Sequence, residues 1–201
     1  IYEYQLQAEI EHEFQMSGAN GPAYTSIVGG GANGCILHYI ENKDMLKNGD
    51  LVLIDAGCEF EDYASDITRT FPVNGKFSDE QAAIYDIVLK ALKEAIDVTQ
   101  AGTPYNKTNE TTIRVITEGL VDLGLLTGDI NDLIKAEAHR EFYMHGAGHW
   151  LGLDVHDVGD YKIDGEWRIY EPGMVVTIEP GIYISPKNKN CLLYTSPSPR
   201  D

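Results

Sequence analysis

Residues 53–71 read LIDAGCEFEDYASDITRTF and place two carboxylates inside apolar runs. The alternation of apolar and polar residues predicts two strands joined by a hairpin turn near Phe60 and Glu61. Asp55 and Asp66 are equally distant from the centre of that turn, so we expect them to face each other with Cβ atoms about 5 Å apart. Because opposed like charges are destabilising and burial adds to the cost, such a pair requires a compensating group.

Three compensating arrangements are open. One carboxylate could hold a proton, as in an aspartic-protease dyad, although neither aspartate has the Asp-Thr/Ser-Gly context of that dyad. A basic side chain, Arg69 or Arg114, could lie between them. A multivalent cation could take both as ligands. The simplest alternative is one aspartate that points to solvent at a strand end, but two symmetric positions inside apolar runs favour a site.

Composition places the chain among globular proteins and excludes several function classes. The 201 residues are 43% hydrophobic and 23% charged, which suits one compact domain. The formal net charge of −17 argues against a nucleic-acid or an anionic-membrane partner. No apolar run approaches the length of a membrane span. The three cysteines are widely spaced, and no signal-peptide pattern opens the sequence, so we expect reduced thiols and a cytoplasmic location.

Hydrophobic periodicity predicts a mixture of helices and strands without regular βαβ alternation, which favours the α+β class. Helices are expected over 2–16, from 78 to near 102, over about 107–123, and in a shorter piece within 130–142. Strands are expected at 35–40, 51–60, 63–73, 142–145, 152–159 and 174–184. Residues 187–201 show no periodicity and include a Ser/Pro run, which predicts a disordered or non-native tail.

Further candidate ligands lie in the C-terminal half. His145, His149 and His156 fall within twelve residues, and Glu179 is another charge inside an apolar run. His145 and His149 have the i,i+4 spacing that would let both bind one metal on a helix. The glycines between them make a regular helix doubtful, so spacing leaves open which histidine binds. His38 lies on an early predicted strand.

This donor set indicates the kind of metal. Oxygen-rich ligands with few imidazoles and no thiolates suit Mn²⁺ or Co²⁺ better than a structural zinc. An aspartate that contacts two ions would imply a two-metal site, in which a shared hydroxide attacks a carbonyl and the ions stabilise the oxyanion.

Four segments together resemble the Xaa-Pro aminopeptidase (aminopeptidase P) family. They are NGCILHYIEN, LVLIDAGCEFEDYASDITRTFPVNGKFSDEQ, MHGAGHWLGLDVHDVG and EPGMVVTIEPGIY. The resemblance implies the pita-bread fold shared with prolidase, methionine aminopeptidase and creatinase, a curved antiparallel sheet covered by helices. It extends to about Pro186, so we expect residues 1–186 to form part of that catalytic domain.

The resemblance also implies roles for individual residues. Asp55, Asp66, His149 and Glu179 would be ligands of two divalent ions, with Mn²⁺ expected and Asp66 bridging both. Glu179 would also carry the proton. Further catalytic and substrate-binding residues are implied as follows: His38 and His156 at the substrate and the tetrahedral intermediate, His145 near the proline pocket, and Tyr183 and Arg168 as substrate-binding residues. The segment around Arg168, DGEWRIYEPG, departs from the family's usual basic content.

The implied reaction is release of an N-terminal residue that precedes proline, by attack of metal-bound hydroxide on the scissile carbonyl. The substrate is thus a proline-containing peptide, and the family suggests a homo-oligomer. The family's last ligand glutamate lies in a segment resembling GIRIED, where this sequence has KNKNCLLYTSPSPRD. We therefore predict weak metal binding and little activity. The alternatives are a prolidase, a non-catalytic peptide- or protein-binding module, and, less compatible with the carboxylates, a metal-free creatinase-like hydrolase.

Overall fold

The computed structural model describes residues 1–185, which group into two compact units. The first unit contains Ile1–Ser78, His149–Asp160 and Gly173–Thr177, and the second contains Asp79–Gly148, Tyr161–Pro172 and the chain from Ile178 onward. The tail predicted at 187–201 lies outside the described residues. Over residues 1–185, no helix is long and apolar enough to cross a membrane.

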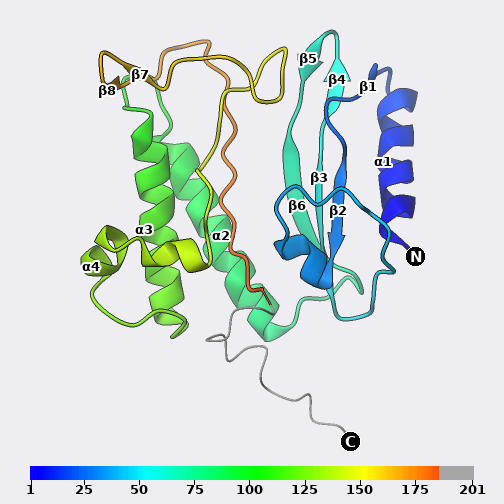
Figure 1. Ribbon diagram of the computed structural model, residues 1–201, viewed down its shortest axis with the longest axis horizontal. Coiled ribbons are helices and arrows are strands. Elements are labelled where there is room, and N and C mark those ends of the chain that lie inside the picture. The colour runs from blue at the N-terminus through cyan, green and yellow to red at the C-terminus, as the bar shows by residue number, and fades with distance from the viewer. Residues whose placement is uncertain (186–201) are drawn as a thin grey trace, which may run out of the picture. The chain divides into compact units, whose positions relative to one another are not determined.

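The first unit combines one long helix, α1 (Glu3–Met16), with two antiparallel three-stranded sheets (Figure 1). One sheet has the order β2-β3-β6, with strands Ile27–Gly30, Leu51–Ala56 and Ile67–Pro72. The other has the order β1-β4-β5, with strands Gly21–Pro22, Cys58–Phe60 and Tyr63–Ala64. Val28, Leu46 and Val52 form the buried core, against which Leu6 of α1 packs. The apolar face of the predicted first helix therefore covers one face of the β2-β3-β6 sheet.

The hairpin of residues 53–71 exists, but its predicted register was wrong. The turn lies at Glu61 and Asp62, which both have left-handed backbone conformations with φ of 50° and 68°. Such a two-residue turn matches the twist of the strands, and because it lies one residue later than predicted, the partner of each residue shifts by two positions. Asp55 of β3 is therefore opposite Thr68 of β6, not Asp66. Asp66 precedes Thr68 by two residues, so alternation places both aspartates on one face as diagonal neighbours.

The predicted strand at 35–40 was also wrong. The chain leaves β2 into a short 3₁₀ helix, η1 (Gly31–Cys35), and continues as a loop in which His38 has a φ of 56°. A left-handed residue interrupts the alternation that a strand requires. The apolar residues of segment 35–40 therefore do not form the buried face of a strand, and Ile36 and Ile40 are more than half exposed.

The predicted strands at 142–145, 152–159 and 174–184 do not form regular ladders either. In the described part of these segments, the one bridge is between Trp150 and Val176. Neighbouring backbone groups still pair individually, as in the bonds from Thr177 N to His149 O at 2.9 Å and from Tyr183 N to Phe142 O at 2.8 Å. Glycines within these segments weaken strand formation, which explains why paired backbone here does not extend into strands.

The second unit is mainly helical. Its elements are α2 (Asp79–Val98), α3 (Asn106–Asp122), α4 (Ile130–Lys135), η2 (Ala138–Glu141) and the hairpin of β7 (Lys162–Ile163) and β8 (Glu166–Trp167). The three predicted helices are confirmed. The small hairpin was missed, although the Asp164-Gly165 pair at its turn is a strong hairpin signal. The core joins α2 and α3 through Ala91, Val115, Ile116, Leu120, Phe142 and Tyr143.

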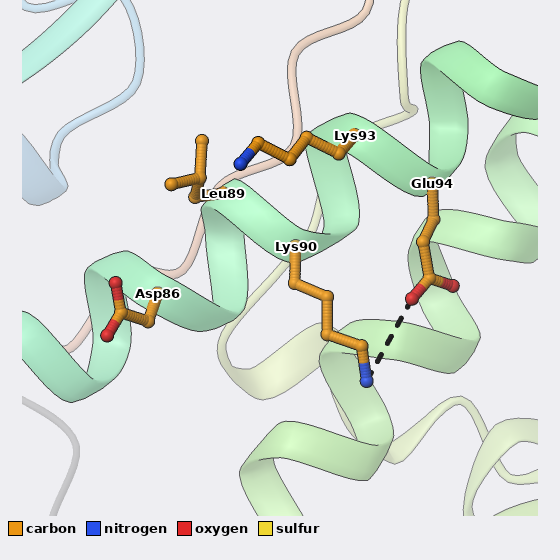
Figure 2. A pocket seen from close by; sticks show the side chains of 5 residues that line it. All are labelled: Asp86, Leu89, Lys90, Lys93 and Glu94. Atoms are coloured by element: carbon orange, nitrogen blue, oxygen red, sulfur yellow. Dashed lines mark ion pairs between the residues drawn. The ribbon is translucent and has the colours of Figure 1, made fainter.

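A shallow hollow lies on the side of α2, lined by Asp86, Leu89, Lys90, Lys93 and Glu94 (Figure 2). Lys90 and Glu94 form an i,i+4 ion pair at 3.9 Å with both side chains well exposed. Exposed pairs of this kind stabilise a helix by only about 0.3–0.5 kcal/mol. The hollow therefore resembles an ordinary solvated helix surface, and we assign no site to it.

Candidate metal centre

Tyr24 connects the two aspartates of the hairpin. Its hydroxyl oxygen lies 2.5 Å from Asp55 Oδ1 and 3.0 Å from Asp66 Oδ1. One phenol proton is therefore available to both carboxylates, and burial together with the two negative charges raises the pKa of Tyr24 far above its usual value. The tyrosine thus remains a donor. Tyr24 was not predicted from the sequence; the one available signal was an aromatic residue with a polar tip just before β2.

His149 lies on the other side of Asp66. Its Nε2 is 3.1 Å from Asp66 Oδ2, and its Nδ1 is 2.8 Å from the Trp150 carbonyl oxygen. A carbonyl oxygen can only accept, so Nδ1 carries the proton. In the neutral ring the Nε2 lone pair then faces a carboxylate oxygen. Two acceptors at this distance are stabilised by a proton or by a metal cation between them.

The backbone fixes the orientation of His149. Its N–H donates to Thr177 Oγ1 at 2.9 Å, and its carbonyl accepts the Thr177 N–H at 2.9 Å. The Trp150 carbonyl also accepts the Asp157 N–H, which ties the following loop to the same point. In that loop His156 packs edge-on against His149, with ring centroids 4.3 Å apart. The structure therefore brings Asp55, Asp66, His149 and His156 together within the first unit.

The charge state of Asp66 follows from these contacts. Burial by itself would raise its pKa, but the hydrogen bonds from His149, when its ring is protonated, and from Tyr24 outweigh burial and lower the pKa below the usual value. The side chains of Asp66 and His149 are only 15% and 17% exposed. Asp66 is thus a largely buried carboxylate held in its anionic form, which is the form that binds a cation.

The two basic side chains considered as compensation, Arg69 and Arg114, have other hydrogen-bond or ion-pair partners. Arg69 follows Thr68 and so lies on the opposite face of β6, where its Nη1 donates to the Thr68 carbonyl at 2.7 Å. Arg114 belongs to the second unit and is paired with Glu118 at 3.9 Å. Two carboxylates on one face, a shared donor and an imidazole with a fixed tautomer fit a divalent cation with mixed oxygen and nitrogen ligands.

The remaining candidate residues belong mostly to the second unit. His145 Nε2 lies 2.8 Å from the Tyr183 hydroxyl, and Tyr143 packs edge-on against the His145 ring at 4.8 Å. Glu179 donates its backbone N–H to the Ala147 carbonyl at 2.8 Å. It lies outside regular strands, unlike the prediction from its apolar run.

Arg168 and His38 occupy different settings. The Arg168 backbone accepts from Tyr105 N at 2.8 Å and donates to Tyr161 O at 3.0 Å, so this residue joins the β7–β8 hairpin to the start of α3. His38, in the first unit, is exposed on the loop that follows η1.

Comparison with known proteins agrees with this geometry. Residues 1–193 match the profile of metallopeptidase family M24. The Xaa-Pro aminopeptidase of Haemophilus influenzae is 60% identical over 184 residues, which cover 92% of this chain and 43% of the relative. That of Escherichia coli is 56% identical over 186 residues, which cover 92% of this chain and 42% of the relative.

Solved structures show the same likeness. Aminopeptidase PepP of Pseudomonas aeruginosa superposes with a TM-score of 0.94 at 60% identity, over 95% of this chain and 43% of that one. Zn-substituted aminopeptidase P of E. coli in complex with product superposes with a TM-score of 0.92 at 55% identity, over 96% of this chain and 44% of that one. The chain therefore spans less than half the length of these proteins. The α+β class and the pita-bread fold are confirmed, and the chain belongs to metallopeptidase family M24.

Proposed function

We propose that this chain carries the metal centre of an Xaa-Pro aminopeptidase. The observation that supports this most strongly is the His149–Asp66–Tyr24–Asp55 cluster, in which the lone pair of an imidazole and two carboxylates converge on one face of the hairpin. The relatives and solved structures compared above are named Xaa-Pro aminopeptidase or aminopeptidase P. Their names give the substrate class: a peptide with proline in second position.

Asp55, Asp66 and His149 would hold two divalent ions, with Glu179 as a further ligand. The support for Glu179 is its position two residues after Thr177, whose backbone is paired with that of His149. Oxygen-rich ligands favour Mn²⁺, although the E. coli relative has been studied in a Zn-substituted form. When bound, such ions activate water and stabilise the developing oxyanion.

The protein's own side chains would bind and orient the peptide. Glu179 is proposed to carry the proton from the nucleophilic water to the leaving proline nitrogen, because a carboxylate that held the ions would lie near both. His38 and His156 would hold the scissile carbonyl region. His145 and Tyr183, already hydrogen-bonded to each other, would form one wall of the proline pocket. Arg168 would bind a substrate carboxylate.

Several predictions from the sequence remain proposals. A catalytic domain over 1–186 and weak metal binding are retained, since residues 180–201 contain no glutamate to act as a fifth ligand. A cytoplasmic location and a homo-oligomer are likewise proposed. The lack of a nucleic-acid or membrane partner is proposed from the net charge of −17.

The test is hydrolysis by the purified chain with Mn²⁺ of an Xaa-Pro-Xaa tripeptide and an Xaa-Pro dipeptide. We expect slow, metal-dependent release of the first residue from the tripeptide, loss of this activity in Asp66→Asn, and its retention in Asp86→Asn, which makes the same change on an exposed aspartate. Cleavage of the dipeptide alone would favour a prolidase. Without hydrolysis, bound metal still indicates an enzyme site, whereas no bound metal and no hydrolysis would favour a non-catalytic module.

A further inference from the structure

Glu3, at the start of α1, is a fully buried carboxylate with 0% exposure that the proposed chemistry does not use. Its Oε1 accepts hydrogen bonds from the Gly30 N–H at 2.8 Å and from Asn33 Nδ2 at 3.0 Å. Its Oε2 accepts from the Tyr39 hydroxyl at 2.9 Å and from the Asp44 N–H at 2.9 Å. Both oxygens of one carboxylate are thus used, and the four donors span the whole segment 30–44.

The chemistry of this cluster requires a carboxylate. Three of the four partners, the two backbone N–H groups and the Asn33 amide, can only donate to it. Burial and the Glu3 carboxylate raise the pKa of Tyr39 to about 12, so the phenol keeps its proton and also donates. A glutamine in place of Glu3 would direct an NH₂ group at donors, and a leucine would leave them unsatisfied. A buried charge is costly unless it is fully hydrogen-bonded, and here it is.

A second buried side chain fixes the same segment. Asn42 is 2% exposed and has a left-handed φ of 45°. Its Nδ2 donates to the Ser26 carbonyl at 2.7 Å and to Gln7 Oε1 at 2.8 Å, and its Oδ1 accepts the Val28 N–H at 2.9 Å. Side-chain hydrogen bonds therefore attach the segment to α1 and β2. The predicted strand would instead have been attached by the backbone hydrogen bonds of a β-ladder.

The segment begins on the face of the sheet that carries Asp55. A Cβ atom added to Gly34 of η1 would lie 3.5 Å from Leu53 Cβ, and one added to Gly29 would lie 2.9 Å from the Gly34 nitrogen. Gly29 and Leu53 are paired across β2 and β3, and Leu53 shares its face with Asp55, two residues on. η1 thus lies over the same face of the sheet as Asp55, at the level of Leu53.

We propose that Glu3 is a positioning residue, which holds segment 31–44 so that His38 reaches the peptide bound at the metal centre. Tyr39 and His38 are adjacent: the Tyr39 side chain is buried against Glu3, and the His38 side chain is exposed. Anchoring Tyr39 therefore fixes the backbone at His38 and the direction of its Cα–Cβ bond. The inference rests on the proposed role of His38, and it assigns the recognition of the substrate in part to a residue of α1.

The first test compares Glu3→Gln with Glu9→Gln, the same change at an exposed position of the same helix. In Glu3→Gln, we expect faster amide hydrogen exchange in segment 31–44 and a broadened or split His38 imidazole signal in NMR spectra, assigned with His38→Ala. Metal affinity should stay at the wild-type value. Tyr39→Phe removes a single donor, so it should show the same changes to a smaller extent even if Glu3→Gln fails to fold.

The second test measures binding of the Xaa-Pro-Xaa peptide in a double-mutant cycle. Glu3→Gln and His38→Ala should each weaken peptide binding or turnover, by up to about 100-fold if His38 moves by an ångström, and the double variant should be no worse than His38→Ala. Additive losses, or an unchanged His38 signal in both Glu3→Gln and Tyr39→Phe, would overturn the positioning role. If His38→Ala alone has no effect, the proposed role of His38 fails, while the exchange and NMR results still report on the Glu3 contacts.

Discussion

Replacement of Tyr24 by phenylalanine tests the carboxylate cluster without touching a proposed ligand. The change removes one hydroxyl that lies within hydrogen-bonding distance of both Asp55 and Asp66. A hydrogen bond to a charged group contributes about 1.5–3 kcal/mol. The Asp66 side chain is 15% exposed, so water can replace part of the lost bond. We therefore expect the free energy of unfolding of the metal-free protein to fall by about 1–2 kcal/mol.

The same substitution should weaken metal binding. Partners that orient a ligand through hydrogen bonds typically change metal affinity by about 10- to 100-fold, so the Kd for Mn²⁺ should rise by about that factor. Urea unfolding in the presence of a chelator gives the first quantity, and isothermal titration calorimetry gives the second. The control is Tyr63→Phe, because Tyr63 is 63% exposed. If both variants unfold alike and bind Mn²⁺ alike, Tyr24 does not support the aspartates and the geometry of the cluster has been misread.

Three further substitutions test the packing and the pH dependence of the two units. Gly29→Ala should cost about 1–3 kcal/mol of unfolding free energy, because a Cβ atom there would lie 2.9 Å from backbone atoms of η1; a cost near zero in urea unfolding would contradict this packing. Leu120→Ala, at a position with 0% exposure, should cost about 2–5 kcal/mol, whereas Leu123→Ala at 41% exposure should cost much less in the same assay. Burial lowers the pKa of His139, so the unfolded chain takes up a proton more readily than the fold, and stability should fall as the pH drops below about 6.5. His139→Gln should flatten that part of the stability–pH curve, and an unchanged slope would show that His139 does not cause it.

Local patterns in the sequence predicted the helices and the hairpin well. The α1 and α2 segments carry long helical periodicities, and the hairpin consists of two apolar runs separated by a polar turn, so each element is determined by its own residues. The register of the hairpin was wrong because it depends on the turn. The sequence pattern does not distinguish a turn at Glu61 and Asp62, which are both left-handed, from a turn one residue earlier. The position of the turn decides whether Asp55 faces Asp66 or Thr68.

The parts that could not be predicted depend on contacts between distant residues. The strand expected at 35–40 is instead a loop. Side-chain hydrogen bonds of Glu3 and Asn42, rather than a β-ladder, attach this part of the chain to its neighbours. Tyr24 is far from Asp66 in sequence, and periodicity carries no information about where its hydroxyl lies. The choice among the histidines was left open by their spacing, and the tautomer of His149 depends on a backbone carbonyl, which leaves no mark on the sequence.

The most direct test of the metal centre is the amount of Mn²⁺ bound by the purified chain, measured by equilibrium dialysis at saturating metal. The wild-type chain and Asp86→Asn should bind Mn²⁺. Asp66→Asn and His149→Ala, which each remove one proposed ligand, should bind less Mn²⁺ than the wild-type chain. Equal Mn²⁺ in all four proteins, or none in the wild-type chain, would contradict the assignment of Asp55, Asp66 and His149 to a metal site.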